Sequence, residues 1–172
     1  MSRIDLSKWI ESDGGPLILM EKSLSNLWGG HSLTGRVLRI TDYDRACQIE
    51  DYLGLLDVGD SKALVLNDEP LSTAYWKINS ENVIFVRWVY AKEESDISDF
   101  LTQAPPIDSW IDTGIKIVFS TEDLVLFDSA YRTNEVEDVL FFQLSKGEYT
   151  AKNLLFKPNN EVSLILHSLS AL

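Results

Sequence analysis

The strongest constraint on the fold is the segment Val83–Tyr90, which reads VIFVRWVY and carries a single charge at Arg87. β-branched and aromatic residues at nearly every position fit a strand that is buried on both faces, so a central strand is predicted. A buried guanidinium must be paired, because an unpaired charge inside a protein is costly. We therefore expect Arg87 to form a structural salt bridge, with Asp68, Glu69 and Asp128 as candidate partners.

Further strands are predicted on both sides of this segment. Residues 9–12 and 17–20 flank a glycine-rich turn at 13–16, which favours a pair of short strands, and 36–40 and 63–66 also read as extended. Consecutive short strands joined by tight turns favour antiparallel pairing. A C-terminal β-meander is therefore predicted from five strands, at residues 115–119, 123–127, 138–144, 148–156 and 161–167.

Two short helices are expected between these strands. Thr41 with Asp44 three residues later resembles a capping box, and Gly54 is the natural end of that helix. Its buried face is predicted from i, i+3, i+7 spacing to carry Ala46, Ile49 and Leu53. An acidic helix follows the central strand, with Ser95 as its cap and Pro105 beyond its end. Its inner face is predicted to carry Ile97, Phe100, Leu101 and Ala104.

The fold class that follows is α+β, with a mainly antiparallel β-sheet, two or three short helices and one domain over residues 1–172. At 172 residues the chain is long enough for a core that needs no disulfide, and its one cysteine, Cys47, can form no internal disulfide. No apolar run exceeds four residues and no signal-like segment opens the chain, so we expect a cytoplasmic protein without a membrane span.

The net charge of −12 makes the chain a poor ligand for nucleic acid or anionic lipid. The acids are concentrated, and the stretch from Glu93 to Asp112 contains no basic residue. Such a face either keeps the protein soluble or steers a basic protein partner toward it. Trp110 lies between two acids after a double proline, and we expect it at the surface as an interface anchor. The predicted partner-binding residues are Glu93, Glu94, Asp96, Asp99, Asp108, Trp110 and Asp112, and the region from Asp42 to Glu69 is the next candidate.

Catalytic motifs are not evident in the sequence, which has no phosphate-binding glycine loop, zinc-protease helix or nucleophile elbow. A hydrolase triad from Ser129, His167 and an acid has no supporting spacing, and a metal site from His31, His167 and carboxylates would need a fortunate fold. Cys47 fits a small core residue better than a nucleophile. We therefore expect no catalytic residue, no metal and no cofactor.

The opening segment WIESDGGPL at 9–17, followed by Trp28-Gly29-Gly30, is similar to the start of the immunity protein 21 family of bacterial polymorphic toxin systems. Further stretches in the same order resemble family blocks: 42–47, 64–70, 86–88, 127–130 and 146–149. The family's usual glycine before the Asp-Glu-Pro step is Asn67 here, and both residues accept turn geometry.

This resemblance implies a cytoplasmic antidote that binds and neutralises a cognate toxin without catalysis. The motif residues themselves look structural, with glycines for turns, tryptophans for packing and a proline at a strand end; they are Trp9, Gly14, Gly15, Pro16, Trp28, Arg87, Trp88 and Asp128. Two alternatives remain open, namely a small hydrolase that depends on carboxylates or histidine, and a ligand-binding or scaffold module that has no toxin partner. The partner that the resemblance implies is the cognate toxin, and the acidic composition favours a basic one; the oligomeric state is not predicted.

Overall fold

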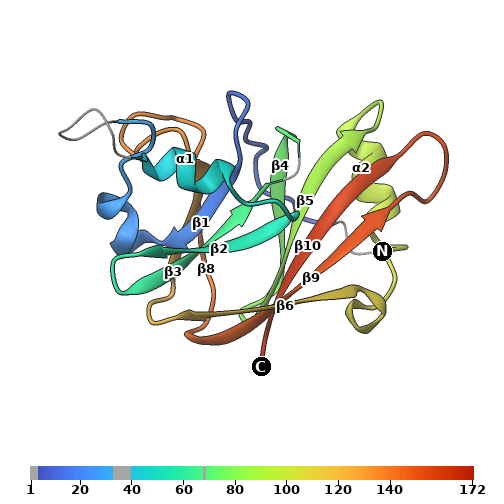
Figure 1. Cartoon of the computed structure of the whole chain (residues 1–172). Coiled ribbons are helices and arrows are strands. Elements are labelled where there is room, and N and C mark those ends of the chain that lie inside the picture. The colour runs from blue at the N-terminus through green and yellow to red at the C-terminus, as the bar shows by residue number, and fades with distance from the viewer. Residues whose placement is uncertain (1–3, 33–39, 68) are drawn as a thin grey trace.

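Strands dominate the computed structural model, which describes residues 4–32, 40–67 and 69–172 (Figure 1). They form two antiparallel sheets of five strands each within these ranges. The first sheet has the order β2 (Leu53–Val58), β3 (Ser61–Leu66), β1 (Leu17–Glu21), β7 (Asp123–Asp128) and β8 (Leu140–Gln143). The second has the order β4 (Thr73–Asn79), β5 (Asn82–Tyr90), β10 (Ser163–Ala171), β9 (Gly147–Phe156) and β6 (Ile111–Phe119).

The two sheets pack face to face around a shared inner core. Because side chains alternate along a strand, β1 sends Leu17 and Leu19 into this core and Ile18 to the opposite face. On β5, Phe85 lies in the inner core and Val86 on the outer face of the second sheet. Both sheets are therefore buried on both faces along their central strands, which explains why these strands read as continuous apolar runs.

Short helical elements cover the outer faces. On the first sheet, η1 (Lys22–Leu27) and α1 (Asp42–Cys47) close an outer cluster that contains Trp28 and Ala46. On the second sheet, α2 (Glu94–Leu101), the turn η2 (Ile107–Ser109) and the N-terminal segment cover the other outer cluster. In Figure 1, α1 and α2 lie at opposite sides of the molecule.

The central strand is confirmed, since β5 pairs with β4 on one side and with β10 on the other. The five C-terminal strands also form, but the continuous meander is wrong. β6 pairs with β9 in the second sheet, whereas β7 pairs with β1 and β8 in the first. The chain crosses between sheets after β6 and after β8, because each sheet needs strands whose inner faces meet across the core.

The predicted pairing of residues 9–12 with 17–20 is also wrong. Ile10 instead exchanges two backbone hydrogen bonds with Thr73 on β4, each of 2.9 Å, and Leu6 forms a bridge with Trp76. The N-terminal segment thereby occupies the outer side of β4, which would otherwise be an unprotected sheet edge. The extended segment expected at 36–40 lies, except for Ile40, outside the described residues.

The capping box of α1 is confirmed, since the Thr41 hydroxyl accepts from the Asp44 N–H and Asp44 accepts from the Thr41 N–H. The helix ends at Cys47, however, and Leu53 opens β2, so Leu53 on a helical face and Gly54 as the helix end are wrong.

The predicted inner face of α2 is confirmed by the burial of Ile97 and Leu101 against the second sheet. Its cap is Glu93 rather than Ser95, because the Glu93 N–H donates to the Asp96 carboxylate over 3.3 Å and the Asp96 N–H donates to the Glu93 backbone carbonyl over 3.2 Å. The helix ends at Leu101, four residues before Pro105.

Arg87 is buried on β5, as the apolar strand around it predicts. Its Nη2 donates to the backbone carbonyl of Glu69 over 2.8 Å. Of the predicted carboxylate partners, Asp68 lies outside the described residues, and Asp128 accepts two backbone N–H groups, from Asp13 and Ala130.

The register of β8 gives a direct test of the sandwich. Phe142 is 7% exposed and packs between Tyr75 and Phe85, whereas its neighbour Phe141 is 57% exposed beside Lys22. We expect Phe142→Ala to lower the free energy of unfolding by about 3–5 kcal/mol, because it empties a site between the sheets. Phe141→Ala should cost less than about 1 kcal/mol. Urea unfolding of both variants measures this, and equal losses would contradict the register.

Candidate functional site

The acids predicted to bind a partner lie along the segment that runs from the N-cap of α2 to the second residue of β6. In Figure 1, α2 lies at one side of the molecule. Because Ile97 and Leu101 face the second sheet, the opposite side of α2 faces solvent. Asp96 is half-buried, and the other acids are exposed, namely Glu93, Glu94, Asp99, Asp108 and Asp112.

Three of these acids are engaged in local structure. Asp96 accepts from the Glu93 N–H over 3.3 Å as part of the helix cap, and Glu93 accepts from the Ser95 hydroxyl over 3.4 Å. Asp112 accepts from the Gly114 N–H over 2.8 Å. The ion pairs within the described ranges involve none of the acids between Glu93 and Asp112. Among the described residues, no basic side chain forms an ion pair with these acids, and their negative charge produces a field that extends into solvent.

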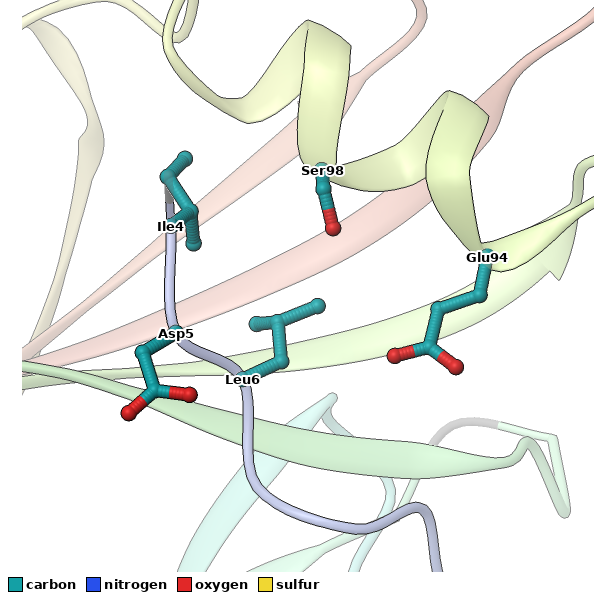
Figure 2. A pocket seen from close by; sticks show the side chains of 5 residues that line it. All are labelled: Ile4, Asp5, Leu6, Glu94 and Ser98. Carbon is teal, nitrogen blue, oxygen red and sulfur yellow. The ribbon is translucent and has the colours of Figure 1, made fainter. Parts of the chain in front are cut away.

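A hollow of about 380 Å³ lies between α2 and the N-terminal segment. Figure 2 shows the carboxylates of Asp5 and Glu94 beside it, with Ile4, Leu6 and Ser98 completing its lining. Asp5 was missed by sequence reasoning, because only the folded chain brings it to α2. A lining that combines the aliphatic side chains of Ile4 and Leu6 with the carboxylates of Asp5 and Glu94 suits a lysine or arginine side chain, whose stem is apolar and whose head is charged.

Trp110 is not at the surface, and the prediction of an exposed anchor there is wrong. Its side chain is 5% exposed, packs in the outer cluster of the second sheet and donates from Nε1 to the carbonyl of Pro105 over 3.0 Å. The flanking acids Asp108 and Asp112 favoured an exposed tryptophan in the sequence. In the structure these acids face solvent, whereas the indole of Trp110 packs in the same cluster as Ile97 and Leu101 of α2.

Four of the stretches that resemble blocks of the immunity protein 21 family meet at one end of the first sheet, in what we call the loop junction. It consists of residues 13–16, 28–30, 42–45 and 128–131. Trp28 is buried and donates from Nε1 to the carbonyl of Ser129 over 2.9 Å. Gly30 lies so close to the next loop that a Cβ there would stand 2.4 Å from the carbonyl oxygen of Ala130.

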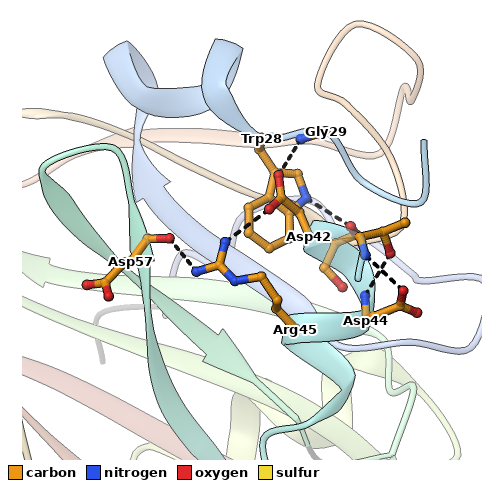
Figure 3. Close-up of polar contacts among 8 residues, drawn as sticks. Trp28, Gly29, Asp42, Asp44, Arg45 and Asp57 are labelled. Carbon is orange, nitrogen blue, oxygen red and sulfur yellow. Dashed lines mark hydrogen bonds and ion pairs between the residues drawn. The ribbon is translucent and has the colours of Figure 1, made fainter. Parts of the chain in front are cut away.

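Asp42 ties α1 to this junction (Figure 3). One carboxylate oxygen accepts from the Gly29 N–H over 2.8 Å and the other pairs with Arg45 over 3.0 Å. Arg45 also donates to the carbonyl of Asp57 on β2 over 2.7 Å. The helix is thereby tied both to the loop at Gly29 and to β2.

Asp128 anchors the opening loop. It is buried at the end of β7, and its two oxygens accept from the N–H groups of Asp13 and Ala130, each over 2.9 Å. Gly14 and Gly15 form the turn ahead of Pro16, whose carbonyl accepts from the Ser129 N–H. The other motif tryptophans, Trp9 and Trp88, meet edge to face with ring centroids 5.2 Å apart in the outer cluster of the second sheet.

These contacts shift the pKa values of two side chains in the loop junction. A hydrogen bond with the Cys47 side chain, aided by burial, raises the pKa of Tyr43 to about 12. Hydrogen bonds from Thr41 lower the pKa of the Asp44 carboxyl. A carboxyl with a lowered pKa stabilises the fold above its ordinary pKa and loses that effect as the pH falls through the lowered value, so this cap weakens only in acid.

The catalytic groups considered from sequence do not converge. Ser129 is buried and donates its hydroxyl proton to the Pro16 carbonyl over 2.6 Å, at the end of the first sheet. His167 lies on β10 of the second sheet with Nδ1 2.7 Å from the Asn153 amide oxygen, and His31 is exposed against Tyr131. Within the described ranges, no group of three or more His, Cys, Asp or Glu residues is placed to hold a metal. Nor does any helix in these ranges have the length and apolar character needed to cross a membrane.

A family model described as Immunity protein 21 matches residues 8–162. The chain belongs to the immunity protein 21 family. The match runs from the N-terminal segment to the turn before β10, so it includes the whole loop junction and the acids from Glu93 to Asp112. Comparison with curated proteins and with solved structures finds no match. For this immunity protein the interface must therefore be argued from its own geometry.

The loop junction predicts a large cost at one glycine. Gly30 and Gly114 both have positive φ, of 60° and 73°, but only Gly30 has no room for a Cβ. Gly114→Ala should cost about 1–2 kcal/mol, from backbone strain alone. Gly30→Ala should cost clearly more, because it must also displace the Ala130 carbonyl. Thermal unfolding of the two variants measures the difference, and equal stabilities would show that the close approach is absent.

Proposed function

We propose that this immunity protein neutralises a cognate bacterial toxin by binding it, without catalysis, through the acidic surface on α2 and the following loop. Family membership supports the class, and the mostly exposed carboxylates, which form no ion pair with the described basic residues, support the surface. The proposed contact residues are Asp5, Glu93, Glu94, Asp96, Asp99, Asp108 and Asp112. Trp110 is left out, because it is part of the packing beneath that surface.

An antidote must associate with its toxin quickly, and the acidic charge of this chain can raise that association rate. Segregated charge raises the rate of encounter with an oppositely charged partner, and the effect falls as salt is added. A toxin that acts on nucleic acid carries a basic face for phosphates. The acidic surface would cover such a face, which makes a basic toxin the proposed partner.

The hollow beside α2 provides a place where one basic side chain of the toxin can be held. Its carboxylates, Asp5 and Glu94, come from two elements that pack against each other, so their spacing is fixed by the fold. We place the complex in the cytoplasm, where a toxin that reaches the cell interior would act, and the proposal needs no cofactor.

Charge reversal tests the proposed surface. We expect Glu94→Lys, Asp99→Lys and Asp108→Lys, combined in one variant, to slow association with the toxin domain encoded beside this gene by about tenfold or more at low salt. These three exposed side chains take no part in the α2 cap, so the fold should be retained. Stopped-flow association over a salt series measures the rate.

A matched control separates location from net charge. Glu122→Lys, Glu137→Lys and Glu161→Lys change the net charge by the same amount at exposed positions on other loops. The control should keep most of the wild-type rate. If both triple variants slow association equally, only total charge matters and the proposed surface is not the interface.

A further inference from the structure

A second surface, distinct from α2, lies where the two sheets leave their edges open on the same side. β2 is the edge of the first sheet and β6 the edge of the second. Between them runs a groove of about 710 Å³, which we call the seam groove. Its walls come from the start of β2, with Tyr52, Leu53 and Leu55, and from the first half of β6, with Ile111 and Ile115; Asn153 on β9 also lines it.

The groove exposes large apolar side chains. Ile111 is 69% exposed and Tyr52 is 43% exposed, although aromatic and branched aliphatic residues are the ones that folding usually buries. Ile111 pairs with Asn153, so Leu155, two residues further along β9, lies diagonally across from Ile111 on the same face. Leu155 is exposed too. The inner face of the second sheet thus continues past the first sheet as an uncovered apolar strip.

One end of the seam groove is acidic. A neighbouring hollow of about 560 Å³ shares Asp51 and Tyr52 with the groove and is also lined by Glu50, Asn67 and Glu69. Three exposed carboxylates therefore stand beside the aromatic ring of Tyr52. At the other end Lys116 lies 3.8 Å from Glu148, which offsets its charge. The combination complements a ligand with an apolar side chain and a nearby cation.

At the β6 edge, a ligand has less opportunity to bind through backbone hydrogen bonds than through side chains. The bulge in β6 between Asp112 and Lys116 interrupts the ladder, and the N–H groups of Gly114 and Ile115 are taken by the side chains of Asp112 and Thr113. Such a bulge keeps a further strand from adding to an edge. Binding in the groove would therefore depend on Tyr52, Ile111 and the carboxylates.

From this arrangement we propose that the seam groove receives an extended segment of the toxin, whose apolar side chain packs between Tyr52 and Ile111 while an adjacent lysine or arginine reaches Asp51 and Glu69. This inference rests on the proposed function, since it takes the toxin as the partner. It adds a desolvated apolar contact to the charged surface on α2. The charged surface sets the rate of capture, and the groove sets the rate of release.

A pair of substitutions on β6 tests the groove. Ile111→Ser removes its exposed apolar wall, and Val118→Ser makes the same kind of change at an exposed residue of the same strand outside the groove. With the toxin domain encoded beside this gene, Ile111→Ser should raise Kd by about tenfold or more, mainly through faster dissociation. Val118→Ser should stay within about twofold of the wild type. Circular dichroism confirms that both variants fold.

Hydrogen exchange on the wild-type complex separates this inference from the proposed function. Protection of amides at 51–55 and 111–116 together with α2 supports both. Protection of α2 alone, with Ile111→Ser binding like Val118→Ser, overturns the groove and leaves the acidic surface. Protection of the groove alone supports this inference and contradicts the acidic surface. Binding with protection at neither place overturns both.

Discussion

Burial of both faces of both sheets is the constraint on which the rest of the structure depends. An inner core holds the sheets together, and each outer face needs its own cover. On the first sheet the cover is η1 and α1, fixed by the loop junction. On the second it is α2 with the N-terminal segment. The position of α2, and so of its outward acids, follows from the need to bury Ile97 and Leu101 against β5 and β10.

Structural support and the proposed recognition of the toxin fall on different parts of the fold. The loop junction, which carries most of the family-like blocks, is a network of buried hydrogen bonds around Trp28 and Asp128 that fixes α1. The proposed contacts in the acidic surface and the seam groove, such as Glu94, Asp99 and Ile111, are exposed side chains outside the loop junction, and their replacement leaves the core intact. Recognition can therefore change without loss of the scaffold, because surface substitutions away from such networks have small effects on stability.

Strands could be predicted from the sequence because their local pattern is strong, as at Val83–Tyr90, where β5 begins one residue earlier. Which strands pair could not, because pairing depends on contacts far apart in the chain. Ile10 was assigned to a hairpin with 17–20 but bonds to Thr73, and β6 reaches past two strands to pair with β9. Leu53 fits a helical spacing with Ala46 equally well, and only its pairing with Leu66 places it in a strand.

The candidate site could likewise be predicted from the sequence only in part. The exposed acids of α2 were visible as a run without basic residues, since charge seldom lies in a core. The burial of Trp110 could not be read, because a tryptophan flanked by acids has the same local pattern at a surface and under one. Asp5 and the seam groove had no local signal at all. Both arise where segments distant in sequence come together, Asp5 beside Glu94 and Tyr52 beside Ile111.

The central claim is that this immunity protein blocks its toxin by occupying it. Titration of the toxin's activity with the purified protein tests this most directly. The account predicts that the remaining activity falls linearly and reaches zero at a fixed stoichiometric ratio of immunity protein to toxin, independent of incubation time once binding is complete. Loss of all toxin effect at a small fraction of that amount, progressing with time, would show turnover and contradict the account.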